Sequence, residues 1–400
     1  MLPGFEPELR LLCALIATEP GASPFAHRPS QSDQHFRWNM FEELVARHRV
    51  SALVDAQLSK MPELAVPSDL RARLAAAPIR NLSFLSRSIR CAREIVEACE
   101  REEIACVILK GFAVAQSAYD QAAKREMIDV DLLVERARFD QVEAMVLEMG
   151  FVRIGPSSEL AGNARSSFMA MHNAFTFIRR SDGMQIDLHW QLVNNPRLLP
   201  KLNLSWQKHL TRMDVAGSSL PVLDPVPHAL YILVHGVKSG WVRLKWLADA
   251  DRIIRRLDPG QLQELIILAG EEQLDRLVAT SLLLTKAVLG TPLNPATQLY
   301  ADTHADRSVL ALQLRLISAP LPAKRKRLSD ARQLALRIEH SLRLHCAPGY
   351  KRAALLREIA NPEDLALVRV PPSWIWVLGL ASPALALARL MRLPFATDRS

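Results

Sequence analysis

The spacing of apolar residues divides the chain into a helical beginning, a strand-rich middle and a helical remainder. In residues 1–103, apolar side chains recur at steps of three and four, as on the buried face of a helix. Helices are predicted over 7–18, twice within 36–60, and over 79–103. The apolar stripe of the last helix is formed by Ile79, Leu82, Leu85, Ile89, Ala92 and Val96. Nothing in this region indicates catalysis, so we expect a helical support.

The pattern changes at residue 104, where a short apolar run leads to a glycine. Residues 104–109 predict a strand, Lys110 and Gly111 follow, and residues 112–119 predict a helix. A glycine between a strand and a helix N-terminus is typical of a phosphate-binding turn, because backbone N–H groups and the helix dipole point at the anion. Lys110 would add a positive charge. A plain strand-to-helix turn is the alternative for the same residues.

Residues 127–134 form the most informative stretch. They alternate as a buried strand, with Asp129 and Asp131 on one face. The two carboxylates would be about 6–7 Å apart and, at an effective dielectric near 20, would repel each other by roughly 2–3 kcal/mol. A Mg²⁺ ion between them would convert this repulsion into binding energy, because hard cations prefer carboxylate oxygens. A strand end with two solvated aspartates is the alternative interpretation.

A hairpin further along the chain supplies a third carboxylate. Strands are predicted at 173–179 and 184–190, joined by a turn at 181–183. In the second strand Asp187 and His189 share one face, opposite the apolar residues. The hairpin therefore brings a third inward aspartate to the sheet.

Together these residues predict metal-assisted phosphoryl chemistry. Two Mg²⁺ ions about 3.5–4 Å apart can clamp the attacking and leaving oxygens of such a reaction. Asp129 and Asp131 would bridge both ions, and Asp187 would complete the site of the ion that carries the attacking hydroxyl. Lys110 and Arg125 would neutralise a triphosphate, the arginine through a forked contact and the lysine through a point charge.

Two helices predicted at 227–238 and 241–256 carry further residues that could face a nucleotide across a cleft. Those residues are His235, Lys238, Arg243 and Lys245. Lys245 lies one helical turn from Asp249, so an ion pair within the helix is the alternative for it.

Composition and charge add little to this interpretation. Of the 400 residues 49% are hydrophobic and 23% are charged, and the formal net charge is +8. The basic residues are scattered, so the excess suits a nucleoside triphosphate and does not indicate a nucleic-acid partner. The five cysteines form no Cys-x-x-Cys pair and are expected to be reduced thiols. Acidic Glu6 and Glu8 argue against a signal peptide, which predicts a cytoplasmic protein.

One apolar segment near the C-terminus is long enough to span a membrane. Residues 370–388 carry no charge, but Pro371, Pro372 and Pro383 interrupt them. A helix packed on the body or lying on a surface is the favoured interpretation. Membrane contact through residues 370–393 is the alternative.

Several of these motifs occur together in a known family. They are Leu109-Lys110-Gly111, Tyr119, Arg125, residues 129–134, Ile186-Asp187-Leu188-His189-Trp190, His235-Gly236, Lys238, Trp241, Arg243 to Leu247, and Asp249. Through them, and over roughly residues 35–340, the chain resembles an uncharacterised bacterial nucleotidyltransferase family of the polymerase-β-like superfamily. The resemblance implies Mg²⁺ dependence and transfer of a nucleoside monophosphate, with Asp129, Asp131 and Asp187 at the metal-ligand positions. Lys110-Gly111 stands where the wider superfamily has Gly-Gly or Gly-Ser.

We therefore expect an α+β protein with a small mixed β-sheet. The nucleotidyltransferase core would occupy 104–195, between an N-terminal helical region at 1–103 and a C-terminal helical region at 196–345, with a tail at 346–400. The expected activity is Mg²⁺-dependent transfer of a nucleoside monophosphate, for example AMP from ATP, to a hydroxyl of a small molecule, peptide or sugar. The catalytic residues would be Asp129, Asp131 and Asp187, and the nucleotide-binding residues Lys110, Gly111, Arg125 and Lys245.

Two other functions stay open at this point. One is a regulatory module that binds a nucleotide without turnover, and the other is a membrane-associated assembly factor that uses residues 370–393.

Overall fold

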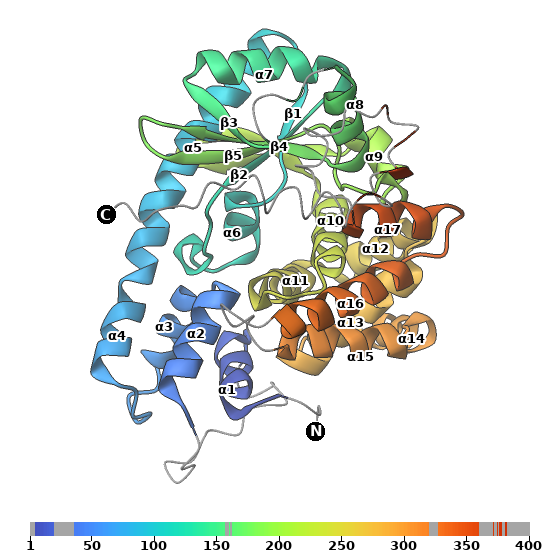
Figure 1. Ribbon diagram of the computed structural model, residues 1–400. Helices are drawn as coiled ribbons and strands as arrows, with labels where there is room; N and C mark the ends of the chain where they lie inside the picture. Colours follow the sequence, from blue (N-terminus) through green and yellow to red (C-terminus); the bar gives the residue numbers. More distant parts are fainter. Residues whose placement is uncertain are drawn as a thin grey trace.

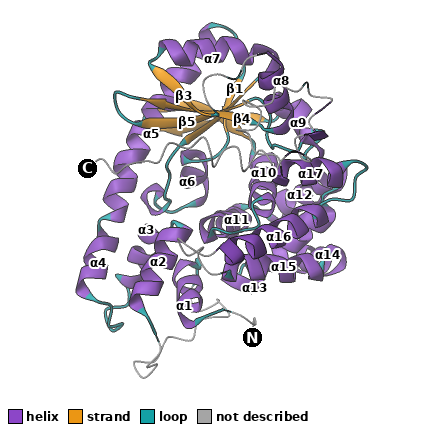
Figure 2. Cartoon of the chain, viewed as in Figure 1, coloured by secondary structure: helices purple, strands orange, loops and turns teal. Residues whose placement is uncertain are grey.

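The structure is a computed structural model that describes residues 5–19, 36–156, 160, 162–319 and 327–359, with isolated positions between 371 and 381 (Figure 1). In this part of the chain a seven-stranded mixed sheet is covered by helices on both faces, so the predicted α+β class is confirmed (Figure 2). The strands are β1 (Cys106–Ile108), β2 (Val130–Val134), β3 (Phe151–Gly155), β4 (Ala174–Arg179), β5 (Met184–His189), β6 (Leu210–Val215) and β7 (Ser218–Leu223).

Strand β2 lies in the middle of the sheet, whose order is β3-β4-β5-β2-β1-β7-β6. It pairs in parallel with β5 and antiparallel with β1. All five of its residues are buried, as expected for a central strand that is covered on both faces. The hairpin of β4 and β5 is antiparallel, as predicted from the sequence.

Helices precede, interrupt and follow the sheet. Before it come α1 (Pro7–Ile16), α2 (Trp38–His48), α3 (Ser51–Leu58), α4 (Ser68–Ala75) and α5 (Ala77–Arg101). Between strands lie α6 (Phe112–Ala118), α7 (Phe139–Glu148), α8 (Gly162–Met171) and α9 (Leu202–Ser205). The sheet is followed by α10 (Pro225–Lys238), α11 (Leu244–Arg256), α12 (Pro259–Glu271), α13 (Asp275–Leu289), α14 (Pro295–His304), α15 (Arg307–Ser318), α16 (Arg327–Arg343) and α17 (Tyr350–Ile359).

The two faces of the sheet pack against different groups of helices. Val130 and Leu132 belong to a core shared with α5, α7 and α8. Leu133 belongs instead to a second core, formed largely by α1 to α3 and α10 to α13. Figure 1 shows α7 beyond one face and α6, α10 and α11 beyond the other. Because side chains alternate along a strand, Asp131 shares the Leu133 face and points toward the helical region.

The sheet extends beyond residue 195, the predicted end of the core. Strands β6 and β7 form a second hairpin over 210–223, and β7 adds to the sheet by pairing in parallel with β1. The sequence pattern also did not predict α8, which begins at Gly162. On α5 the buried stripe begins only at Leu85, since Ile79 and Leu82 lie in its first turns and are exposed.

The predicted apolar tail lies almost entirely outside the described residues. Among the helices that the structure describes, none combines the length and the apolar character that a membrane crossing requires.

Candidate functional site

The pairing of β2 with β5 sets the geometry of the site. The register places Asp131 directly beside Asp187, and Leu133 beside His189. One carboxylate oxygen from each aspartate and one ring nitrogen of His189 all lie within 4.8 Å of one another. The hydroxyl of Thr176 on β4 donates to Asp187 Oδ1 at 2.7 Å, which fixes that carboxylate from the other side. Adjacent strands therefore deliver three ligand atoms to one point.

Asp131 is buried and bonded to two cationic or polar partners. Lys110 Nζ lies 2.7 Å from Asp131 Oδ1, and His189 Nε2 lies 3.1 Å from the same oxygen. Burial alone would raise the pKa of Asp131, but Lys110 and His189 hold it well below its usual range. The other ring nitrogen of His189 contacts the side-chain amide of Asn173 at 2.9 Å, which orients the ring.

The other two aspartates carry poorly compensated charge. Burial, followed by repulsion from Asp131, raises the pKa of Asp129 to about 6. The same two causes raise the pKa of Asp187. Two carboxylates that resist ionisation beside a third that is ionised mark a place where a divalent cation would be bound strongly. Carboxylate oxygens with one imidazole nitrogen are a donor set that fits such an ion.

The structure thus brings Asp131 and Asp187 together as the sequence suggests, and adds His189. Asp129 lies outside the group of three close ligand atoms and acts on it electrostatically. The sequence did place His189 on the same strand face as Asp187, but sequence reasoning gave it only a supporting place.

Lys110 and Gly111 lie at the turn between β1 and α6. Gly111 has a φ of +63°, and an added Cβ would approach the backbone oxygen of Asp129 at 3.5 Å. The turn therefore runs close to the acidic strand, in a conformation that favours glycine. The amine of Lys110, predicted to contact a triphosphate, points instead at Asp131.

Arg125 has a different place from the one predicted. Its guanidinium is buried and forms two bonds of 2.8 Å with the carboxylate of Asp249 on α11. A third bond runs to the backbone oxygen of Gly111 at 3.0 Å. The hydroxyl of Tyr119 donates to the same carboxylate at 2.7 Å. Arg125 therefore supports the Gly111 turn. It is not presented to a phosphate, because two of its nitrogens already donate to the carboxylate of Asp249.

Lys245 is also buried, and its amine donates to the backbone oxygen of Glu126 at 3.1 Å. Burial, followed by repulsion from Arg125, lowers its pKa to about 7, although Asp249 and Asp129 act in the opposite direction. The alternative pairing of Lys245 with Asp249 is not observed. Lys245 lies instead within electrostatic reach of the acidic strand.

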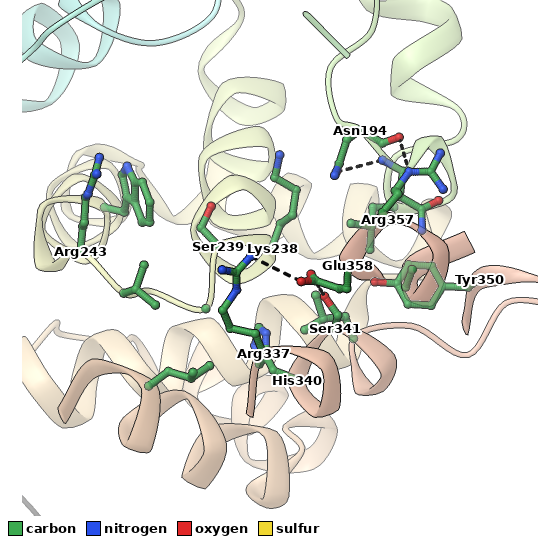
Figure 3. Close-up of a pocket in the computed structure, with 18 of the residues that line it drawn as sticks. Asn194, Lys238, Ser239, Arg243, Arg337, His340, Ser341, Tyr350, Arg357 and Glu358 are labelled. Atoms are coloured by element: carbon green, nitrogen blue, oxygen red, sulfur yellow. Dashed lines mark hydrogen bonds and ion pairs between the residues drawn. The ribbon is translucent and has the colours of Figure 1, made fainter. Parts of the chain in front are cut away.

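A cavity of about 740 Å³ lies between the end of α2, the α10–α11 corner, the segment after β5, and helices α15 to α17, and its lining does not include Lys110, Asp129, Asp131, Asp187 or His189. Figure 3 shows Arg243 at one end, Lys238 in the middle and Arg357 with Asn194 at the other end. Arg49, Lys238 and Arg243 form neither an ion pair nor a side-chain hydrogen bond with any described residue. We call these three residues the basic wall.

The basic wall is electrostatically connected to the acidic cluster. Burial, and then Lys110, lower the pKa of Lys238 to about 8, while Asp131 raises it. Burial, and then Arg49, lower the pKa of Arg243, while Asp129 acts in the opposite direction. His235 is less exposed to the cavity and packs edge-on against Trp246, with ring centroids 5.3 Å apart. Cations without partners next to clustered carboxylates fit a ligand that combines phosphates with divalent metal.

A known family shares the region that forms this site. No curated protein matches the chain. The sequence model of a family described as uncharacterised nucleotidyltransferase matches residues 34–290, which is more than half of the chain. The matched region includes every strand of the sheet together with α10 and α11. The resemblance inferred from the motifs is confirmed: the chain belongs to the uncharacterised nucleotidyltransferase family.

Proposed function

We propose that this protein transfers a nucleoside monophosphate from a nucleoside triphosphate to a hydroxyl group, with Mg²⁺ held by Asp131 and Asp187 and with Asp129 adding negative charge beside the ion. The observation that carries the proposal is the parallel register of β2 and β5, which sets Asp131 beside Asp187. Bound Mg²⁺ supplies charge neutralisation at the phosphates and lowers the pKa of a hydroxyl that it contacts.

In the proposed reaction the acceptor oxygen forms a bond to the α-phosphorus of the triphosphate. The bond between that phosphorus and the bridging oxygen breaks, and pyrophosphate leaves with the electron pair. Asp187 would take the hydroxyl proton, because it lies directly beside Asp131, where the acceptor hydroxyl would meet the bound ion.

The residues of the chain divide into three roles in this proposal. The basic wall (Arg49, Lys238 and Arg243) holds the triphosphate through charge, Lys110 pairs with Asp131, and Lys245 adds charge near Asp129. Gly111 allows the turn to pass close to the acidic strand. Arg125 is a positioning residue, which holds Gly111 against α11 through Asp249.

The test is pyrophosphate release with each nucleoside triphosphate, beginning with ATP, in the presence of Mg²⁺ and a cell extract. Asp131→Asn and Asp187→Asn are each expected to abolish release, because each removes a ligand charge without changing side-chain size. Asp214→Asn on β6 is the matched control, since Asp214 is exposed and distant from the cluster in the sheet order.

Release that survives both substitutions would reject the assignment of the metal ligands. Triphosphate binding by the wild type without any pyrophosphate release would favour the regulatory module instead.

A further inference from the structure

The cavity has a second wall, which the chain adds after the region that it shares with its family. The family match ends at residue 290, whereas α15, α16 and α17 span residues 307–359. From these helices Leu316, Arg337, Ser341, Tyr350 and Arg357 line the cavity. We call them the distal wall. In Figure 3 Arg337 and Ser341 lie opposite Lys238 of α10 and Ser239, which follows that helix.

The distal end of the cavity is positively charged. Arg357 donates hydrogen bonds to the backbone oxygens of Ala170, Met171 and Asn194, and to Ala353 within its own helix. None of these partners is a carboxylate, and burial lowers the pKa of Arg357 to about 10. A half-buried guanidinium that is held by neutral carbonyls keeps its charge uncompensated and favours an anion nearby.

Among the described residues that line the cavity, only Glu358 is acidic, and its carboxylate already has hydrogen-bond partners. Its two oxygens receive the hydroxyl of Ser341 at 2.8 Å and the guanidinium of Arg337 at 3.4 Å. Arg337 itself is largely exposed, and only its Nη2 contacts Glu358. Its other N–H groups therefore stay available to a ligand. The charge balance of this end therefore remains positive.

Asn195 provides an independent observation. Its side chain is 4% exposed, and its Oδ1 accepts a hydrogen bond from the backbone N–H of Arg197. Its Nδ2 is buried and has no hydrogen-bond partner among the described residues. A buried amide donor without a partner is unfavourable, and an oxygen of a ligand in the cavity would satisfy it.

We propose that the distal end of the cavity binds the acceptor of the transfer reaction, and that this acceptor is a small molecule with a carboxylate or phosphate group as well as its hydroxyl. This inference rests on the proposed function. The anionic group meets Arg337 and Asn195, while Leu198, Leu344 and Tyr350 contact the apolar part of the molecule. The basic wall, which runs from Arg243 at the other end to Lys238 in the middle, remains for the triphosphate. A volume of about 740 Å³ suits small ligands.

The experiment begins with the wild-type protein. The small-molecule fraction of a cell extract is divided on an anion exchanger into retained and unretained pools. Each pool is incubated with Mg²⁺ and a triphosphate labelled at the α-phosphate. Labelled product is expected only from the retained pool. Product from the unretained pool alone would overturn the inference and leave the proposed function in place. Absence of pyrophosphate release with either pool would overturn the proposed function, and this inference with it.

Two matched pairs of variants then locate the anionic group. Asn195→Asp keeps the oxygen that caps Arg197 but replaces the free donor by a negative charge. Asn203→Asp is its control, because Asn203 accepts a backbone bond from Leu192 in the same way but lies outside the cavity lining. We expect Asn195→Asp to raise the acceptor KM roughly tenfold or more, since a charged hydrogen bond is lost.

Arg337→Gln forms the second pair with Arg352→Gln, which removes one exposed charge from α17 outside the cavity lining. Arg337→Gln is expected to raise the KM of the acceptor several-fold without a corresponding change in the KM of the triphosphate. Equal acceptor KM values in both test variants and their controls would overturn the inference. A rise in the triphosphate KM that matches the rise for the acceptor would overturn it as well, because the two ends would then be one site.

Discussion

Arg125 and Asp249 form a doubly bonded ion pair that joins the segment before β2 to helix α11. Both side chains are almost completely buried, with exposed fractions of 4% and 2%. The same guanidinium bonds the backbone of Gly111, and the same carboxylate receives the hydroxyl of Tyr119. One network therefore fixes the glycine turn, the acidic strand and the helical region relative to one another.

Removing one partner of this pair should destabilise the protein strongly. Asp249→Asn leaves the guanidinium of Arg125 buried without a counter-charge, for which we expect a loss of about 3–5 kcal/mol in the free energy of unfolding. Urea denaturation followed by circular dichroism measures it. Asp302→Asn is the control, because Asp302 forms an exposed ion pair with Arg307 at 3.4 Å, and such pairs contribute little. Similar losses in both variants would contradict the network described here.

Divalent cations should stabilise the fold even in the absence of a nucleotide. Mg²⁺ or Mn²⁺ would relieve the repulsion among Asp129, Asp131 and Asp187, and at about 100 times its Kd the ion would add about 2.7 kcal/mol to the free energy of unfolding. Thermal melts with and without the ion measure the effect. Asp187→Asn should melt at the same temperature under both conditions. A metal-induced shift of wild-type size in that variant would place the ion elsewhere.

Triphosphate affinity should fall at alkaline pH because of Lys238. Its pKa of about 8 lies below the usual lysine value, so the amine is charged below pH 8 and becomes neutral as the pH rises through that value. The KM for the triphosphate is therefore expected to increase above about pH 8. In Lys238→Arg the charge persists, so this alkaline rise should disappear. If the two proteins show the same pH profile, Lys238 does not contact the triphosphate.

Gly236 should not tolerate even a methyl group. A Cβ at this position in α10 would lie 2.1 Å from Cζ3 of Trp241, whose side chain is fully buried and cannot move aside. Gly236→Ala is expected to cost about 1–3 kcal/mol or more through overpacking. Gly270→Ala in α12 is the control, since its Cβ would meet the carboxylate oxygens of Asp275 at ordinary contact distances of 3.6 and 3.8 Å. Unfolding midpoints in urea compare the two, and an unaffected Gly236→Ala would show that the α10–α11 corner is looser than the structure indicates.

The strands and helices predicted from the sequence are those in which local pattern and tertiary packing agree. The apolar alternation around Asp131 predicts a strand in a sheet that is covered on both faces. Strand β2 is such a strand, since all of its residues are buried. The β6–β7 hairpin was not predicted. Its second strand contains Pro221, which lowers strand propensity, and it joins the sheet through Ile108 opposite Val222, a contact between distant parts of the chain.

The site was predictable to the extent that strand faces decide it. Two-residue periodicity places Asp187 and His189 on one side, and the parallel register then carries them to Asp131. The partners of the cations were not predictable. The sequence predicts a phosphate contact for Arg125 and an ion pair between Asp249 and Lys245. Sequence spacing reveals only neighbours on the same element, so it does not show that Arg125 and Asp249 meet. Their mutual pairing depends on how α11 docks against the turn before β2.

The parallel register of β2 and β5 also decides which changes of chain length the protein can accept. Inserting one residue within β5 after Met184 would exchange inward and outward side chains, so that Ile186 and Leu188 would replace Asp187 and His189 beside Asp131. Extra residues in the turn at 181–183 would leave that parity intact. Homologous chains should therefore vary in the length of this turn. Within β5 itself they should show no insertion or deletion of a single residue.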